Sequence, residues 1–316
     1  MTHIYGPVPS RRLGYSLGVD ILPFKTCSLD CIYCQLGHSE RQTVRRKKHF
    51  DPCTILGQIK KATSSGKRID TITFSGSGEP TLNVLIGNLI REIKNTTTIP
   101  VAVLTNSTLL THKSVRQALS RADIVVPSLD AASQVIFDRM NRPHASLKIA
   151  KVIEGLKAFR QEFRGKIWLE ILFVKGVNDS PDHLRKLKKA IDGIDPDKIQ
   201  LNTVVRPPAE KSAQSLRFDE LEKIRDFFGK KAEVVAEFEK IPHVPASSNL
   251  KEAILAMVRR RPVTLADMSM ALGKHKNELT PYCNALQEEG KIRLVIHKSK
   301  KFYKSNRFKA RRNSGE

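Results

Sequence analysis

Short apolar segments alternate with amphipathic helical patterns through most of this 316-residue chain. Strand-like segments are expected at residues 18–24, 70–75, 101–105, 123–127, 167–174 and 199–205. Apolar residues at helical spacing predict helices at residues 51–63, 82–94, 114–119, 147–163, 182–191 and 219–228. Strands connected through helices pair in parallel, with the helices outside the sheet. The sequence therefore predicts an α/β fold, either an open doubly wound sheet or an incomplete barrel.

The pattern changes after residue 241, where prolines at positions 242 and 245 indicate a linker over residues 242–248. Helices are expected at residues 249–261, 264–272 and 276–289, followed by strands at 292–297 and 301–304. Three helices and a small hairpin predict a winged helix-turn-helix domain at residues 249–305. Residues 306–316 are basic and are expected to form a disordered tail.

The chain is strongly basic, with a formal net charge of +23 from 55 Lys and Arg against 32 Asp and Glu. Such an excess attracts polyanions, and nucleic acid is the commonest of these partners. Basic residues concentrate in the predicted winged helix, where Phe302 and Tyr303 lie among them and either stack on bases or pack inside. They are Arg259, Arg260, Arg261, Lys274, Lys276, Lys298, Lys300, Lys301 and Lys304. A protein-binding or purely structural role for this domain stays open.

Membrane insertion and secretion are not expected. No apolar run approaches the ~20 residues needed to span a bilayer. The first twelve residues contain prolines and arginines rather than the apolar stretch of a signal peptide. The sequence predicts a soluble protein of the cytoplasm.

Three of the five cysteines lie within eight positions, as Cys27, Cys31 and Cys34 of the segment CSLDCIYC. A secreted disulfide-rich domain is shorter and richer in cysteine, so the crowded thiols indicate metal ligands. Three thiolates on one tight loop can bind three irons of a 4Fe–4S cluster and leave the fourth iron open to a small molecule. The other two, Cys53 and Cys283, are expected to be buried small apolar side chains.

Two other metal sites fit part of the same spacing. His38 would complete a zinc site in the pattern C-x3-C-x2-C-x3-H, although no second pair of cysteines lies nearby. Cys53 or Cys283 would complete a four-cysteine ferredoxin-type cluster, although neither has the local spacing of that motif. The spacing favours the open three-cysteine cluster.

The cysteine segment resembles the cluster loop of the radical S-adenosylmethionine (SAM) superfamily, and Tyr33 matches the aromatic residue usual before its last cysteine. The segment FSGSGEPT at residues 74–81 resembles the superfamily's Gly-Gly-Glu-Pro motif, with Ser77 inserted between the glycines. The two motifs occur in the expected order, at the ends of the first and second strands. The resemblance implies an incomplete (β/α)6 TIM-type barrel over about residues 14–240, and a catalytic domain at residues 1–241.

The same resemblance implies an activity and its cofactors. In the superfamily, the open iron of the 4Fe–4S cluster binds the amino and carboxylate groups of SAM. One electron from the reduced cluster splits the sulfonium of SAM into methionine and a 5′-deoxyadenosyl radical, which abstracts hydrogen from a substrate. The chain is therefore expected to be an enzyme that receives electrons from a donor such as flavodoxin or ferredoxin.

Residues at the ends of the predicted strands are candidates for binding SAM. Backbone carbonyls of Gly76, Ser77 and Gly78 can approach the ammonium group closely, because glycine has no side chain. Glu79 either brings a carboxylate to the same turn or caps the next helix, and Tyr33 either packs against adenine or lies under the loop. The resemblance implies that the third and fourth strand ends contact the ribose and the methionine carboxylate. The candidates there are Asn106, Ser128 and Asp130.

Four further polar residues follow or lie on the fifth and sixth strands. They are Lys175, Asn178, Asn202 and Arg206. Because loops at these strand ends border the mouth of a barrel, the four side chains either face the substrate or cap helices. The sequence does not single out a catalytic residue.

The opening GPVPSRRLGYSLGVDILPFKTCSLDCIYCQ resembles a group of uncharacterised radical SAM proteins related to wyosine-forming tRNA enzymes. Wyosine enzymes carry a second cluster on additional N-terminal cysteines, and this sequence has no cysteine before Cys27, so the wyosine reaction itself is not expected. With the basic C-terminal domain, the resemblance favours radical modification of RNA, in particular tRNA. Two alternatives stay open: a radical enzyme acting on a protein or peptide, including activation of a glycyl radical partner, and an iron–sulfur DNA-binding regulator.

Overall fold

The computed structural model describes residues 2–10, 12–39, 42–235, 250–274 and 276–306. The predicted linker at 242–248 and the predicted tail beyond residue 306 lie outside the described residues. Within the described ranges, no helix combines the length and the apolar character needed to cross a bilayer.

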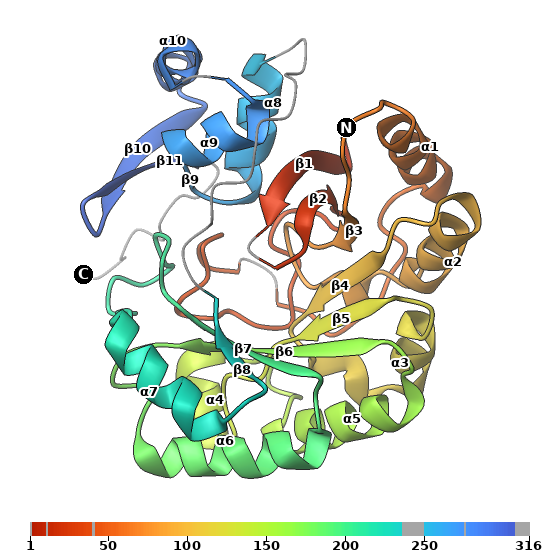
Figure 1. Cartoon of the computed structure of the whole chain (residues 1–316), viewed down its shortest axis with the longest axis vertical. Helices are drawn as coiled ribbons and strands as arrows, with labels where there is room; N and C mark the ends of the chain where they lie inside the picture. Colours follow the sequence, from red (N-terminus) through yellow and green to blue (C-terminus); the bar gives the residue numbers. More distant parts are fainter. Residues whose placement is uncertain (1, 11, 40–41, 236–249, 275, 307–316) are drawn as a thin grey trace.

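One sheet of eight strands organises the larger part of the chain, and each strand pairs with the next one along the sequence (Figure 1). The strands are β1 (Ile4–Ser10), β2 (Gly14–Val19), β3 (Thr71–Phe74), β4 (Val101–Thr105), β5 (Ile124–Pro127), β6 (Lys166–Phe173), β7 (Lys198–Thr203) and β8 (Ala232–Val234). Strands β2 to β8 run parallel, and β1 is antiparallel to β2. Because β1 and β8 are the two edges, the sheet stays open, and the predicted mostly parallel α/β fold is confirmed.

The six predicted strands correspond to β2 through β7, but the first is displaced. A strand is predicted over residues 18–24, whereas β2 ends at Val19. The chain turns after Val19, where the amide of Asp20 donates to the carbonyl of His3 at 2.7 Å and Pro23 has no N–H to continue a ladder. For β1 the sequence predicts only extended chain, because it contains two prolines. The structure tolerates these prolines because β1 is an edge strand. No strand is predicted at β8.

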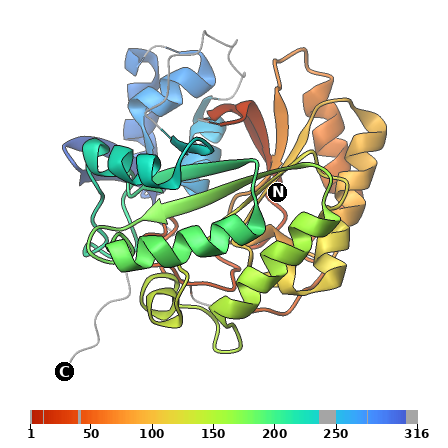
Figure 2. The same ribbon diagram turned by 60° about the horizontal axis from the view of Figure 1, so that its bottom comes forward.

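Helices cover the outer side of the sheet (Figures 1 and 2). They are α1 (Pro52–Thr63), α2 (Ile86–Thr96), α3 (Lys113–Leu119), α5 (Ile149–Glu162), α6 (Pro181–Ile194) and α7 (Phe218–Phe228). Three short elements follow strand ends: η1 (Pro80–Leu82), η2 (Thr108–Thr111) and α4 (Gln134–Asn141). Helix α4 is not predicted from the sequence, because its eight residues are too few to show a clear helical period.

The main hydrophobic core lies between these helices and the sheet. All four residues of β3 are buried, as expected for a central parallel strand covered on both faces. Helix α1 begins at its cap residue Asp51, which accepts a hydrogen bond from the amide of Thr54 at 2.9 Å, and it buries Ile55 and Ile59. Local caps and apolar spacing therefore place the helices, and burial against the strands holds them.

The C-terminal region, residues 250–306 as described, has its own hydrophobic cluster. Its elements are α8 (Leu250–Arg260), β9 (Val263–Thr264), α9 (Leu265–Leu272), α10 (Lys276–Glu288), β10 (Ile292–His297) and β11 (Lys300–Ser305). The strands form a small antiparallel sheet in the order β10-β11-β9. Phe302 and Tyr303 are buried, so of their two predicted roles the structure shows packing and not base stacking. Val8 of β1 joins this cluster, which places the C-terminal region against the N-terminal hairpin (Figure 1).

Candidate iron–sulfur and S-adenosylmethionine site

The three clustered cysteines lie on an irregular segment after β2, residues 25–39, here called the cysteine loop. The amide of Asp30 donates to the carbonyl of Asn141 at 3.0 Å, which ties the loop to the end of α4. The amide of Thr43 donates to the carbonyl of Cys27 at 2.9 Å. Contacts with distant segments, rather than regular secondary structure, therefore shape this loop.

A side-chain N–H donor reaches each of the three cysteine sulfurs, and the three donors come from three different segments. Lys25 Nζ lies 2.8 Å from Cys34 Sγ, Asn106 Nδ2 lies 3.5 Å from Cys27 Sγ, and Asn141 Nδ2 lies 3.4 Å from Cys31 Sγ. Lys25 starts the loop, Asn106 follows β4, and Asn141 ends α4. Donors directed at cysteine sulfurs stabilise thiolates and tune iron–sulfur clusters.

The environment of the sulfurs fits a positively charged metal group. Burial raises the pKa of the Cys27 thiol to about 11 and also raises the pKa of the Cys31 thiol. A thiolate in such surroundings persists only beside positive charge. Lys25 supplies one such charge at Cys34. Three thiolates need more positive charge than Lys25 alone supplies. The irons of a 4Fe–4S cluster would supply it, so the three thiols and their N–H donors fit such a cluster.

The structure does not support the zinc site with His38 or the four-cysteine cluster with Cys53 or Cys283. His38 Nδ1 lies 3.2 Å from Asp30 Oδ2, and within the described residues no three His, Cys, Asp or Glu side chains are arranged around a single metal position. The cysteines of a 4Fe–4S cluster bind different irons, so they do not need to converge on one point. Cys53 lies on α1, and Cys283 packs in the C-terminal region with its sulfur 3.6 Å from Met268 Sδ. Neither is placed as a fourth ligand.

The prediction that both outlying cysteines are buried is right for Cys283 and wrong for Cys53. Cys53 is exposed in the first turn of α1. The buried side of this helix is formed by Ile55 and Ile59, and a side chain two residues before Ile55 points roughly 200° away from it. Cys53 therefore faces solvent.

The two glycines of FSGSGEPT allow this segment to lie directly against the chain around the cysteine loop. A Cβ atom on Gly78 would lie 1.9 Å from the carbonyl oxygen of Thr26. A Cβ atom on Gly76, where φ is +133°, would lie 2.6 Å from Asp20 Cγ. Glycine is required at both positions because any side chain would clash.

Ser77 and Glu79 form hydrogen bonds within the protein. Ser77 Oγ donates to Asp20 Oδ2 at 2.5 Å, and the Ser77 carbonyl accepts from the amide of Lys25 at 2.6 Å. The buried carboxylate of Glu79 accepts four hydrogen bonds, from Thr81 N (3.1 Å), Thr81 Oγ1 (2.5 Å), Thr105 Oγ1 (2.7 Å) and Asn106 N (2.6 Å). Of the two roles considered for Glu79, the structure shows the cap, at the start of η1.

Asp130 is the centre of a buried network that reaches the cysteine loop. The Tyr33 hydroxyl donates to Asp130 Oδ2, and Asn141 Nδ2 donates to the same oxygen at 2.9 Å. The amide of Leu172 donates to Asp130 Oδ1 at 2.9 Å. Burial raises the pKa of Asp130 to about 6 and also raises the pKa of Tyr33. Asp130 therefore orients Tyr33 and Asn141, and Asn141 also reaches the Cys31 sulfur.

Asn106 and Ser128 follow the neighbouring strands β4 and β5, as predicted. Besides the Cys27 sulfur, Asn106 Nδ2 contacts Ser28 Oγ at 3.0 Å, which directs this side chain toward the cysteine loop. The Ser128 carbonyl accepts from Ser107 Oγ at 2.7 Å, which fixes the turn after β5.

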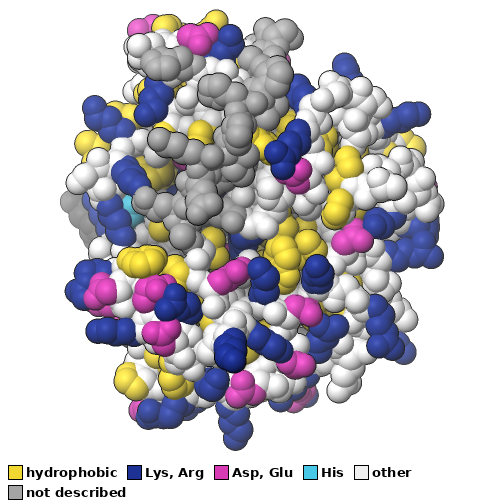
Figure 3. Space-filling view, in the orientation of Figure 1, with side chains coloured by type: hydrophobic (Ala, Val, Ile, Leu, Met, Phe, Trp, Pro, Cys, Tyr) yellow, Lys and Arg dark blue, Asp and Glu magenta, His cyan; other side chains and the backbone are white. Residues whose placement is uncertain are grey.

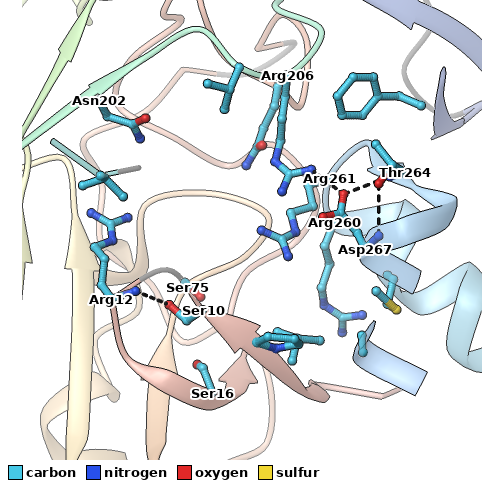
Figure 4. A pocket seen from close by; sticks show the side chains of 18 of the residues that line it. Ser10, Arg12, Ser16, Ser75, Asn202, Arg206, Arg260, Arg261, Thr264 and Asp267 are labelled. Atoms are coloured by element: carbon cyan, nitrogen blue, oxygen red, sulfur yellow. Dashed lines mark hydrogen bonds and ion pairs between the residues drawn. The ribbon is translucent and has the colours of Figure 1, made fainter. Parts of the chain in front are cut away.

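A cavity of about 920 Å³ opens beside the cysteine loop, between the strands of the eight-stranded sheet, here called the barrel strands, and the C-terminal region (Figure 4). The predicted site residues that line it are Tyr33, Cys34, Gly76, Gly78, Asn202 and Arg206. Lys175 and Asn178 make contacts elsewhere. Lys175 pairs with Glu220 of α7 at 2.9 Å, and Asn178 Nδ2 donates to the Asp130 carbonyl at 2.9 Å.

Several site residues have no clear signal in the sequence. Lys25 and Asn141 contact cysteine sulfurs, and Arg12 and Glu170 form an ion pair of 2.9 Å in the cavity wall. A basic residue two positions before Cys27 is a usable signal for Lys25. Asn141 has no such signal, because its helix is not predicted and it is separated from Cys31 by 110 residues.

Comparison with known proteins points to one family. The family model described as the radical SAM superfamily matches residues 21–187. The UPF0026 protein MJ1312 of Methanocaldococcus jannaschii is 32% identical over 313 residues, which is 97% of this chain and 97% of that protein. A Brachyspira hyodysenteriae protein named GTPase Obg is 37% identical over 299 residues, covering 93% of this chain and 44% of that protein. This chain thus spans less than half the length of that relative.

More distant proteins match part of the chain. The dual-specificity RNA methyltransferase RlmN of Nitratidesulfovibrio vulgaris is 26% identical over 197 residues, covering 58% of this chain and 51% of that protein. The crystal structure of a radical SAM methyltransferase from Sphaerobacter thermophilus has the same fold, with a TM-score of 0.54 at 16% identity over 69% of this chain and 66% of that chain. This chain belongs to the radical SAM superfamily and is an enzyme that uses a 4Fe–4S cluster and SAM.

Proposed function

We propose that this radical SAM enzyme modifies RNA and that its substrate is tRNA. The observation that carries the proposal is the net charge of +23. Phosphate backbones bind basic surfaces through attraction and counterion release, so such a chain favours a polyanionic substrate. Two relationships support RNA in particular: the distant relative named as an RNA methyltransferase, and the sequence resemblance to relatives of wyosine-forming tRNA enzymes.

We assign Cys27, Cys31 and Cys34 as the ligands of three irons of the cluster. When bound and reduced, the cluster supplies the electron that splits SAM to give the 5′-deoxyadenosyl radical for hydrogen abstraction. Lys25, Asn106 and Asn141 direct N–H groups at the three sulfurs and thereby stabilise their thiolate form.

We assign SAM to the cavity beside Cys34. Tyr33 is oriented there by the hydrogen bond from its hydroxyl to Asp130, so its position is set before a ligand binds. Gly76 and Gly78 present backbone to the same space without side chains. Four further candidates act by fixing the loops that form this wall. They are Ser77, Glu79, Asn106 and Ser128.

We assign residues 1–241 to the catalytic domain and residues 249–305 to a winged helix-turn-helix domain. The order helix, strand, helix, helix and hairpin in the described C-terminal region supports this assignment. In this proposal the winged helix contacts the RNA, the enzyme works in the cytoplasm, and flavodoxin or ferredoxin delivers the electron.

Nucleoside mass spectrometry tests the substrate. The reconstituted and reduced enzyme is incubated with SAM and total tRNA from cells that lack this protein, and the RNA is digested to nucleosides. We expect a new nucleoside mass that does not form with the Cys31→Ala variant. An unchanged nucleoside profile, with modification of a protein or peptide in the same cells' extract, would contradict the RNA substrate.

A further inference from the structure

The cavity beside Cys34 has two walls of different origin. Barrel strands form one wall, through residues such as Thr73 of β3, Glu170 of β6 and Asn202 of β7. The C-terminal region forms the other wall, through the end of α8, the start of α9 and the hairpin β10–β11 (Figure 4). The C-terminal region is therefore part of the active-site cavity and not a separate module beside it.

The lining of this cavity is strongly cationic. Among the described residues it contains seven Lys and Arg side chains and two carboxylates. Both carboxylates are already paired, Glu170 with Arg12 at 2.9 Å and Asp267 with Arg206 at 3.3 Å. The C-terminal region contributes most of the cations: Arg260, Arg261, Lys276, Lys300 and Lys301.

SAM does not account for this charge. The molecule carries a sulfonium and an ammonium group against a single carboxylate, so its net charge is positive. A wall of Lys and Arg side chains repels such a ligand everywhere except at its carboxylate. The cations of the C-terminal wall therefore serve the second occupant of the cavity, the substrate, and they select negative charge.

Five of the seven cations form an inner and an outer group, and the other two, Arg12 and Arg260, are paired with Glu170 and Asp20. Arg206 and Arg261 are partly buried, and their side chains extend toward each other between the barrel strands and the C-terminal helices in Figure 4. Lys276, Lys300 and Lys301 are exposed. Guanidinium groups bind phosphate through paired N–H donors, whereas lysines act as point charges on flexible stems. An inner pair of arginines and an outer set of lysines suits a chain of phosphates that leads into the cavity.

The size of the cavity limits what can enter. Its volume of about 920 Å³ lies near the upper end of the ~300–1,000 Å³ usual for ligand pockets. This volume suits the cofactor together with one nucleotide, but not a folded RNA. Enzymes that act on a base commonly turn the target nucleotide out of its stack into such a pocket.

We infer that the C-terminal region binds the phosphate backbone of RNA at the mouth of the active-site cavity, and that the target nucleotide enters between this region and the barrel strands. The inference rests on the proposed RNA substrate and adds the groups that bind it. Arg261 holds the phosphate beside the target nucleotide, and Arg206 contributes its remaining N–H groups from its ion pair with Asp267. The outer lysines hold the phosphates that follow. The outer surface alone does not locate such a path, because Lys and Arg side chains are scattered over the described parts of the face in Figure 3.

The hairpin β10–β11 offers a matched experiment, because only some of its basic residues line the cavity. The double variant Lys300→Gln/Lys301→Gln removes two positive charges from the lining. The double variant Arg293→Gln/Lys298→Gln removes two exposed positive charges from the same hairpin, outside the lining. Binding of tRNA to the reconstituted holoenzyme is measured by fluorescence anisotropy at several salt concentrations.

We expect the Lys300/Lys301 variant to bind tRNA about tenfold more weakly and to lower the slope of log affinity against log salt by about 2. We expect the Arg293/Lys298 variant to bind tRNA within about twofold of wild type, because its side chains do not line the cavity that the target nucleotide enters. Arg261→Gln against the exposed neighbour Arg259→Gln repeats the comparison for the inner group. Circular dichroism and the thermal midpoint establish that each variant is folded.

The outcomes separate the inference from the proposed function. Equal weakening in the two hairpin variants, or weakening in neither, would overturn the inference while the RNA substrate stands. Failure of the wild-type enzyme to bind tRNA would contradict the proposed function itself. Polyglutamate that competes as well as tRNA, with the same loss in the Lys300/Lys301 variant, would replace RNA by an acidic protein. Nucleoside monophosphates that bind as tightly as tRNA would replace it by a small phosphorylated ligand.

Discussion

The cysteine loop and the C-terminal region face one cavity, but different kinds of contact build them. The loop is held by short contacts with distant segments, including side-chain donors at the Cys27 and Cys31 sulfurs and a glycine contact with no room for a Cβ atom. The C-terminal wall presents long basic side chains, several of them exposed. This difference indicates that the chemistry depends on fixed geometry, whereas substrate binding depends on charge that flexible side chains can deliver.

The largest effect is expected at the cysteines of the loop. Replacing Cys27, Cys31 or Cys34 by Ala removes one of three ligands, so iron content should fall from about four per chain to near zero. Cleavage of SAM should disappear with it. Analysis of iron and sulfide after anaerobic reconstitution measures the effect. Cys53→Ala and Cys283→Ala are the controls, and loss of the cluster in either control would contradict the three-ligand assignment.

Gly78→Ala tests whether the loop depends on close packing. The new Cβ atom would lie 1.9 Å from the Thr26 carbonyl oxygen, and we expect the free energy of unfolding to fall by about 3 kcal/mol. The matched control is Gly57→Ala on α1, where a Cβ atom meets nothing within 4 Å. That substitution should raise the free energy of unfolding by about 0.5–1 kcal/mol, because alanine favours the helix. Urea denaturation compares the two, and equal stability of both variants would refute the packing argument.

Arg260 of the C-terminal region contacts residues that lie before the cysteine loop, and it tests whether the two regions are independent. Its Nε lies 3.8 Å from Asp20 Oδ2, and its guanidinium carbon lies 4.3 Å from the centre of the Tyr5 ring. Arg260→Gln leaves the buried Asp20 without a cationic partner and should lower the free energy of unfolding by about 2 kcal/mol. Because Asp20 also accepts a hydrogen bond from Ser77, we expect a higher KM for SAM as well. The exposed neighbour Arg259→Gln should change neither quantity.

The pH dependence of the Arg260→Gln defect has a definite sign. Burial raises the pKa of Asp20, and loss of a nearby cation raises it further. A carboxyl group with a higher pKa in the folded state than in the unfolded state makes the folded protein bind more protons. Stability then falls as pH rises through the folded pKa. The defect should therefore shrink at acid pH, where Asp20 is protonated, and grow toward neutral pH. A defect that is independent of pH would show that Asp20 is not the partner.

The smallest effect is expected at Cys53. Its thiol is exposed on α1, away from both regions, so a maleimide should label it readily in the reconstituted enzyme. Labelling should leave iron content and SAM cleavage unchanged. Mass spectrometry of tryptic peptides identifies the labelled residue. Labelling that displaces iron would place Cys53 near the cluster, contrary to the structure.

Most of the fold can be predicted from the sequence, because caps and apolar spacing act locally. The six central strands and the helices around them follow such signals, as do the helices and the hairpin of the C-terminal region. The misses have physical reasons. Helix α4 is too short to show a helical period. Strand β1 contains prolines, which are compatible with a strand only at a sheet edge, and the sequence does not show that β1 lies there.

The candidate site can be predicted only where residues are close in sequence. Cys27, Cys31 and Cys34 share one short motif, and Gly76 and Gly78 share another. The hydrogen bonds of Asn141 to the Cys31 sulfur and to Asp130 join distant segments, so no local sequence pattern predicts them. The Lys and Arg side chains that line the cavity cannot be predicted either, because the net charge of a chain does not show which of its basic residues face a cavity.

The measurement that tests this account most directly is the yield of 5′-deoxyadenosine from SAM. The enzyme is reconstituted anaerobically with iron and sulfide, reduced with dithionite, and assayed with and without total tRNA. We expect product from the wild-type chain, more product when tRNA is present, and none from the Cys31→Ala variant. Absence of product from a wild-type chain that purifies with zinc instead of iron would contradict the assignment of the cysteine loop as a radical SAM centre.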